Sequence, residues 1–188
     1  MSGLTPDRIE ERLRERFPGV AFERQTGEAV RDHTVYVPVD RIAEIATFLR
    51  DDPELDFAML SFVTAVDLLP RSPRFEVVYS LLSLSNNLRF TLKVVLNDEN
   101  PRVPTVTGVW PTANWHEREA YDFFGIEFTG HPDLTRILLP DNWVGWPLRK
   151  DSPLGYEEVA FTHNTPRRIK PDPGLKKLAP KKVRYRAH

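Results

Sequence analysis

Three consecutive runs of apolar and β-branched residues, at 57–69, 74–83 and 88–97, constrain the fold of this chain more than any other feature. Asn86-Asn87 separates the second run from the third and tolerates the positive φ of a tight turn, so these two runs predict a β-hairpin. The first run is shorter than the roughly 20 apolar residues of a membrane-spanning helix, and it contains Asp67. We therefore expect three strands in the middle of the chain.

A helix and two short strands are predicted ahead of these runs. Residues 5–17 repeat apolar side chains at helical spacing, and Pro18-Gly19 would end that helix. Residues 20–24 and 34–39 have the composition of short strands. Asp40 is placed to cap a second amphipathic helix.

A third helix follows the strands. Asn114 and Glu117 have the spacing of a capping box at its start, and Gly125 is placed to close it in a left-handed conformation. This order of elements predicts an α+β fold, a two-layer sandwich of helices on a mixed, mostly antiparallel sheet, with a long irregular C-terminal extension. We assign residues 1–127 to the α/β domain and residues 128–188 to an extended, proline-rich, basic C-terminal arm.

The charges are segregated along the chain, although 26 basic and 27 acidic side chains leave a net charge of −1. Residues 161–188 hold nine basic side chains and one acid, a net +8, which leaves −9 for residues 1–160. Such segregation favours a tail that lies on another protein; a solvated tail, or one that touches nucleic acid or anionic lipid, is an alternative. The acidic body would repel phosphates, so we expect no nucleic-acid partner.

Several kinds of site are excluded by the composition. The chain has no cysteine, so it cannot form a disulfide, a thiolate zinc site, a cysteine nucleophile or a cysteine-ligated iron–sulfur cluster. It contains no glycine-rich dinucleotide or phosphate loop and no Gly-x-Ser-x-Gly motif. The N-terminus lacks the apolar core of a secretory signal.

The segment 103–151 carries the strongest functional signals. One hypothesis is a metal-dependent enzyme that uses His116, Glu119, Asp122 and His131, but a zinc-binding helix would need a second histidine where Ala120 stands. The main interpretation is an amphipathic helix whose acids are solvated or paired. An interface is the other alternative, because this stretch concentrates the tryptophans, which are Trp110, Trp115, Trp143 and Trp146.

Several blocks of sequence carry a resemblance to a known family. They are Arg74–Leu84, Val103–Thr107, Trp110–Trp115, Glu117–Ile126, Gly130–Leu134, Arg136–Pro140 and Pro147–Asp151. In this order they resemble the 30 kDa subunit, also called the C subunit, of the proton-pumping NADH:quinone oxidoreductase known as respiratory complex I. The resemblance is strong over residues 57–155. Thr135 and Trp146 stand where the family favours other residue types.

The resemblance implies a non-catalytic structural subunit of the peripheral arm of that complex, on the cytoplasmic side of the cell membrane. The complex would pass electrons from NADH through flavin and iron–sulfur clusters to quinone, coupled to proton translocation. FMN, clusters and quinone would belong to the complex, with no cofactor, metal or catalytic residue on this chain. A related membrane-bound hydrogenase or ferredoxin-dependent complex is an alternative.

The resemblance also implies partners and site residues. The expected neighbours are the D subunit, which carries the quinone site, and the B subunit, and the membrane would be reached only through the complex. The signature and interface residues are expected to be Trp115, Glu117, Arg118, Glu119, Tyr121, Asp122, Gly125, His131, Pro132, Arg136, Arg149, Lys150 and Asp151.

Overall fold

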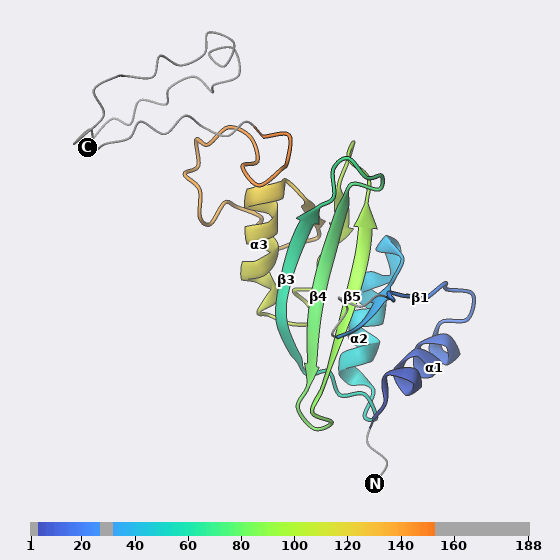
Figure 1. Ribbon diagram of the computed structural model, residues 1–188. Helices are drawn as coiled ribbons and strands as arrows, with labels where there is room; N and C mark the ends of the chain where they lie inside the picture. Colours follow the sequence, from blue (N-terminus) through green and yellow to red (C-terminus); the bar gives the residue numbers. More distant parts are fainter. Residues whose placement is uncertain (1–3, 27–31, 153–188) are drawn as a thin grey trace, which may run out of the picture.

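The computed structural model describes residues 4–26 and 32–152, where three α-helices accompany a five-stranded sheet and a two-stranded one (Figure 1). The elements are α1 (Pro6–Arg16), β1 (Glu23–Arg24), β2 (His33–Tyr36), the 3₁₀ helix η1 (Val39–Arg41), α2 (Ile42–Asp51), β3 (Met59–Asp67), β4 (Phe75–Ser83), β5 (Leu88–Leu96), β6 (Arg102–Pro104), α3 (Ala113–Phe124) and β7 (Glu127–Thr129). The three strands expected in the middle of the chain are confirmed as β3, β4 and β5.

The large sheet has the strand order β1-β2-β5-β4-β3. β4 and β5 form the predicted hairpin, and Asn87 in its turn has the positive φ of 48° that the sequence suggested. β2 pairs with β5 in parallel, while the other three pairings are antiparallel. The fold is therefore α+β with a mixed, mostly antiparallel sheet, as predicted.

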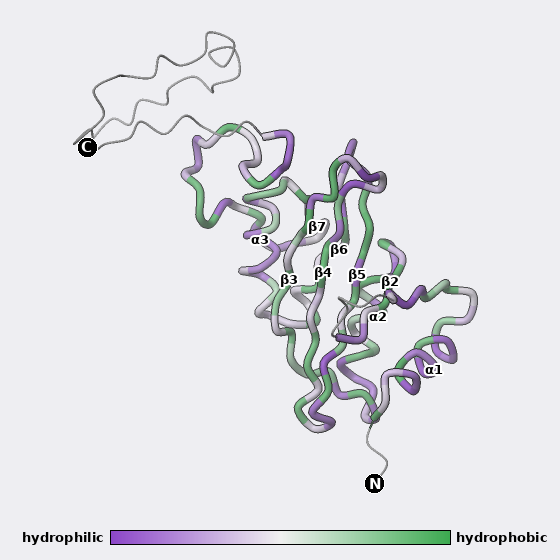
Figure 2. The backbone as a smooth tube through the Cα atoms, in the orientation of Figure 1, coloured by the Kyte–Doolittle hydropathy of each residue, from purple (hydrophilic) through white to green (hydrophobic). Residues whose placement is uncertain are grey.

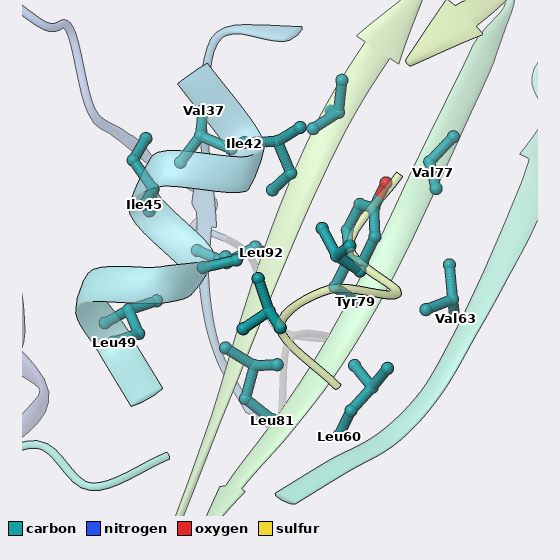
Figure 3. Close-up of a cluster of buried hydrophobic side chains, with 14 of the residues drawn as sticks. Val37, Ile42, Ile45, Leu49, Leu60, Val63, Val77, Tyr79, Leu81 and Leu92 are labelled. Carbon is teal, nitrogen blue, oxygen red and sulfur yellow. The ribbon is translucent and has the colours of Figure 1, made fainter. Parts of the chain in front are cut away.

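One face of the sheet carries the hydrophobic core. Figure 3 shows Ile45 and Leu49 of α2 on the same side as Leu81 and Leu92 of the sheet, and all four side chains are fully buried. Each such side chain stabilises the fold by about 1.5–3 kcal/mol relative to an exposed one. On the opposite face Phe62 is 42% exposed, so the described helices cover one face only.

Two predicted caps are wrong. α3 begins at Ala113, and no side chain caps it; the backbone N–H of Asn114 instead donates to Pro111 O at 3.2 Å. Asp40 lies inside η1, where Arg41 N donates to Pro38 O and forms a 3₁₀ turn. In both places a preceding backbone turn leads into the helix and takes the place of a side-chain cap.

α3 packs on β3 at the edge of the sheet, and the chain then forms β7 and runs back past the helix. We call residues 130–152 the return segment; it is yellow to orange in Figure 1. Figure 2 shows hydrophobic stretches along the central strands and again along this segment. The basic tail at 161–188 lies outside the described residues. None of the helices in 4–26 and 32–152 is long and apolar enough to cross a membrane.

Candidate interaction surface around helix α3

Helix α3 carries side chains of two kinds. Some contact other residues of this chain, and others face outward. Glu117 and Asp122 are fully buried, whereas Trp115 is 59% exposed and Glu119 is also exposed. Two carboxyl groups with no solvent contact require hydrogen-bond partners, because an unpaired buried charge costs several kcal/mol. The structure supplies a different set of partners for each acid.

Asp122 holds the return segment through its carboxylate. Oδ2 accepts the backbone N–H groups of Ile137, Leu138 and Leu139 at 2.8–3.1 Å, and Oδ1 accepts from Arg136 Nη1 at 2.7 Å. Burial alone would raise the pKa of Asp122, but these four hydrogen bonds hold the pKa below its usual value. A charged carboxylate thereby gives a turn without secondary structure a defined conformation.

Arg118, four residues before Asp122 on α3, holds the same segment. Its Nε donates to Thr135 O at 3.1 Å, and its Nη2 donates to Thr135 Oγ1 and to Arg136 O, each at 3.0 Å. The guanidinium also lies over the ring of Trp115, 5.4 Å from its centroid. Arg118 does not pair with Asp122 four residues later, since both side chains are used by the return segment.

Gly125 ends α3 in the left-handed conformation that the sequence predicted, with φ of +70°. A Cβ at this position would overlap the ring of Trp146, so glycine also makes room for the tryptophan. The ring of Tyr121 meets Trp146 edge-on at 5.2 Å, and Arg136 lies over Trp146 at 4.7 Å. Trp146 thus fixes the return segment against the C-terminal end of α3.

Arg74 ties the far end of the return segment to the sheet. Its guanidinium is buried and bonds Asp67 at 2.8 and 3.0 Å, Asp98 at 2.9 Å and Asp151 at 2.6 and 3.0 Å. Asp67 also accepts from Lys150 N at 2.8 Å. The hydrogen bonds from Arg74 lower the pKa of Asp67 far below its usual value. This cluster is a charge-assisted junction between β3, β4 and the return segment.

Two neighbouring basic side chains complete this junction. Arg149 donates from Nε to Phe124 O at 2.6 Å, and its guanidinium lies 5.1 Å from the ring centroid of Phe75. Burial, and then the charge of Arg74, lower the pKa of Arg149. Lys150 donates from Nζ to Leu69 O at 3.1 Å. These contacts satisfy a carbonyl at the end of α3 and one beyond β3.

Glu117 lies under α3 beside the loop that follows β6. Its Oε1 accepts from Val106 N at 2.8 Å, and its Oε2 lies 2.5 Å from Thr105 Oγ1. His131 Nε2, at 4.0 Å from Oε2, is too distant for a hydrogen bond. Burial raises the pKa of Glu117 to about 7, although the hydrogen bonds from Thr105 and Val106 partly oppose the shift.

The outward-facing part of this region includes several large apolar side chains. The return segment and α3 expose five large hydrophobic side chains, which we call the exposed apolar set. They are Trp115, Leu138, Trp143, Val144 and Leu148. Trp110, in contrast, belongs to the core and donates from Nε1 to Phe57 O at 3.1 Å. The four tryptophans therefore divide between the core, the outside of α3 and the return segment.

The hypothetical metal ligands do not come together. Asp122 is occupied by the return segment, Glu119 faces outward, and His131 Nδ1 accepts from Asp133 N at 3.1 Å. Within residues 4–26 and 32–152, no group of three or more His, Asp or Glu side chains could hold a metal ion. These four side chains, which include His116, therefore form no metal-binding cluster in this arrangement.

Among the remaining expected site residues, Pro132 is exposed and Lys150 and Asp151 lie at the Arg74 junction. Arg74 and Asp67 were not among the expected site residues. A signal for both residues is present in the sequence. Arg74 stands just ahead of an apolar strand and Asp67 at the end of the preceding one, and charges at such positions need partners.

A family model described as “Respiratory-chain NADH dehydrogenase, 30 Kd subunit” matches residues 35–158, which is more than half of the chain. The chain belongs to this family. The C subunit of NADH-quinone oxidoreductase from Roseiflexus sp. (strain RS-1) is 55% identical over 157 residues, which cover 84% of this chain and 89% of that protein. The corresponding C subunit from Herpetosiphon aurantiacus is 48% identical over 83% of this chain and 89% of its own length.

Two solved structures are similar to this chain in fold. A trypsin-resistant fragment of Nqo5 aligns with a TM-score of 0.57 and 36% identity, and covers 68% of this chain and 98% of the fragment. A chain of the membrane-bound sulfane sulfur reductase, an archaeal respiratory membrane complex, aligns with a TM-score of 0.64 and 26% identity over 77% of this chain and 84% of its own.

Proposed function

We propose that this chain is a non-catalytic structural subunit of the peripheral arm of an NADH:quinone oxidoreductase. Its membership of the 30 kDa subunit family, with relatives that match along most of their length, carries the proposal. The absence of cysteine from the whole sequence supports it, since the chain cannot ligate an iron–sulfur cluster through thiolates. Electrons would pass from NADH through flavin and clusters on other subunits to quinone, coupled to proton translocation.

The geometry around α3 supports an assembly role. Asp122, Arg118 and Arg74 hold a segment that has no regular secondary structure, and the exposed apolar set lies on that segment and on α3. A surface that is already ordered loses less conformational entropy when a partner binds than a flexible one does. Aromatic and aliphatic anchors in a fixed arrangement are what a stable protein interface requires.

The proposed neighbours are the quinone-site D subunit and the B subunit of the same complex, on the cytoplasmic side of the cell membrane. The chain would reach the membrane only through them. FMN, iron–sulfur clusters and quinone would bind elsewhere in the complex, and neither a cofactor nor nucleic acid is assigned to this chain.

A second candidate is the equivalent subunit of a related membrane complex with another electron donor. The likeness to a chain of the membrane-bound sulfane sulfur reductase favours it, because that chain shares this fold at 26% identity. The two candidates differ in the other subunits. An NADH-oxidising, flavin-containing module should accompany this chain only under the first proposal.

The test is recovery of the tagged full-length chain from native membranes in mild detergent, followed by identification of co-purifying proteins and an NADH:quinone reductase assay. Val144 is 82% exposed on the return segment, and Val144→Asp should reduce partner recovery by roughly tenfold or more, the effect of losing one interface anchor. Leu84→Asp is the matched control, since Leu84 is 68% exposed at the distant β4–β5 turn.

Equal recovery of partners with Val144→Asp and Leu84→Asp would contradict the role of the exposed apolar set. Recovery of the chain alone, or with proteins unrelated to a redox complex, would contradict the proposed function itself. Partners without an NADH-oxidising module would favour the second candidate.

A further inference from the structure

Glu117 and His131 face each other beneath α3 without an ordinary ion pair. Both side chains are fully shielded from solvent, and no Lys or Arg in the described part of the chain pairs with Glu117. His131 Nε2 is buried and has no hydrogen-bond partner, and the hydroxyl oxygen of Tyr79 nearby also lacks one. A buried acid without a cation next to an unsatisfied nitrogen is an unusual arrangement, because buried polar groups are nearly always paired.

The hydrogen bond from Asp133 fixes the tautomer of His131. Asp133 N donates to His131 Nδ1 at 3.1 Å, so Nδ1 carries no proton. Burial lowers the pKa of His131, which keeps the ring neutral near neutral pH. A neutral ring with a bare Nδ1 carries its proton on Nε2. The atom that points toward Glu117 is therefore a donor without an acceptor in regular hydrogen-bond geometry, although the backbone of Asn114 lies close enough to act on the ring.

The oxygen atoms around Glu117 can serve either of its protonation states. Thr105 Oγ1 lies 2.5 Å from Glu117 Oε2 and 2.9 Å from Thr107 Oγ1. When Glu117 is protonated, Oε2–H donates to Thr105, whose own hydroxyl donates to Thr107. When Glu117 is ionised, both hydroxyls turn and Thr105 donates to Oε2. Loss of the proton therefore leaves the threonines satisfied and adds one strong acceptor that faces His131.

We propose that Glu117 and His131 form a proton-operated latch between α3 and the start of the return segment. We assign the open state, with Nε2 and Oε2 4.0 Å apart, to protonated Glu117. When Glu117 releases its proton to water, the Nε2–H of His131 donates to Glu117 Oε2. The two atoms must approach by roughly 1 Å to reach the usual distance of a charge-assisted hydrogen bond.

The exposed residues on either side of His131 favour this movement. It leaves β7 at Gly130, which has a positive φ of +81° and is exposed, and Pro132 and Asp133 are exposed as well. A shift of about 1 Å at His131 would be absorbed by these residues before the anchors at Asp122 and Arg74. The proton state of a buried glutamate would thereby set the position at which the return segment begins.

The other titratable and charged groups around the pair do not replace this contact. Tyr79 faces Glu117 from β4, and burial raises its pKa well above the usual value, so it stays neutral. Besides burial, the backbone of Asn114 raises the pKa of His131, the charge of Arg118 on α3 lowers it, and the charge of Asp133 beyond β7 raises it. Burial raises the pKa of Glu117 to about 7, so the latch would operate close to neutral pH.

The test is an NMR titration of the full-length chain, with ¹³C-labelled glutamate and ¹⁵N label, from about pH 4 to pH 9. The carboxyl carbon of Glu117 should titrate with a midpoint near 7, and the His131 ring nitrogens and the Asp133 amide should shift with the same midpoint. Glu117→Gln should abolish that transition at His131 and Asp133. Glu119→Gln, on the exposed side of the same helix, should leave it unchanged.

Three results would overturn the latch. Glu117 could titrate at the ordinary carboxyl value of 4.5, it could fail to titrate anywhere below about pH 9, or His131 and Asp133 could ignore its ionisation. The titration of the unaltered chain decides among these even if Glu117→Gln fails to fold. As a further check, His131→Phe removes the donor and should raise the Glu117 midpoint measurably.

Discussion

Replacing Asp122 with asparagine should release the return segment from α3. The carboxylate accepts four hydrogen bonds, three from the backbone of residues 137–139 and one from Arg136. An amide of the same shape offers one oxygen and one NH₂ group. Whichever way it turns, its NH₂ group meets either the three N–H groups or the guanidinium, and donors then face donors.

The structure sets the size of the effect. Removing one partner of a buried ion pair costs about 3–5 kcal/mol, and each unsatisfied buried donor costs about 1–3 kcal/mol. Arg136 is 13% exposed and water can reach part of it, so we expect the lower end, about 3 kcal/mol. That loss is a large share of the roughly 5–15 kcal/mol that keeps a domain folded.

Two measurements on the full-length chain check this prediction. Urea unfolding followed by tryptophan fluorescence should give the loss of about 3 kcal/mol at neutral pH. Hydrogen exchange should accelerate at the amides of 137–139 more than in β4 or β5. The pKa of Asp122 is lower in the folded state than its usual value of 3.8. The stabilisation from its carboxylate is therefore fully present above pH 3.8 and is lost as the pH falls through the folded-state pKa. The difference in the free energy of unfolding between Asp122→Asn and the parent should therefore become smaller in acid.

Glu119→Gln is the matched control, since Glu119 is exposed on the same helix and its loss should change the free energy of unfolding by less than about 0.5 kcal/mol. The reasoning is refuted if Asp122→Asn is as mild as this control. It is also refuted if the amides of 137–139 exchange as slowly as in the parent, because the return segment would then be held by something else.

Two further perturbations separate the other anchors. Gly125→Ala should lower the free energy of unfolding by about 1–2 kcal/mol for the left-handed backbone and by a further 1–3 kcal/mol for displacing Trp146. In a Trp146→Ala background, urea unfolding should show only the loss of about 1–2 kcal/mol from the backbone. Arg74→Met should cost about 3–5 kcal/mol because it strands buried Asp67, whereas Asp151→Asn, at a 54% exposed carboxylate, should cost no more than about 1 kcal/mol by the same assay.

The sheet could be predicted from the sequence because its signals are local. Runs of apolar and β-branched residues define β3, β4 and β5, and the Asn86-Asn87 turn fixes the hairpin between two of them. Gly125 as the end of α3 depends on one residue type at one position. The capping predictions at Asp40 and Asn114 failed because the pattern of a cap does not reveal whether a preceding backbone turn takes its place.

The contacts of the candidate site were harder to predict from the sequence. Spacing places Glu117, Glu119 and Asp122 on one short helix, but only packing decides that Glu119 alone faces outward. Asp122 finds its partners 14 to 17 residues away, and Arg74 finds Asp151 at a separation of 77. Contacts of this length leave no local pattern in a single sequence, so the partners could not be named in advance.

The contacts that Glu117, Asp122 and Arg74 make within the chain change how assembly defects in this family should be interpreted. Glu117, Asp122 and Arg74 are shielded from solvent and bind groups of their own chain, so a neighbouring protein meets them only if the return segment opens. A variant at such a position that fails to assemble is explained as well by a displaced return segment as by a lost contact. Val144, whose side chain is exposed and bears no internal hydrogen bond, separates the two causes, because its substitution leaves the anchors in place. A partner surface can therefore be mapped only with outward-facing residues, and only in variants whose free energy of unfolding is unchanged.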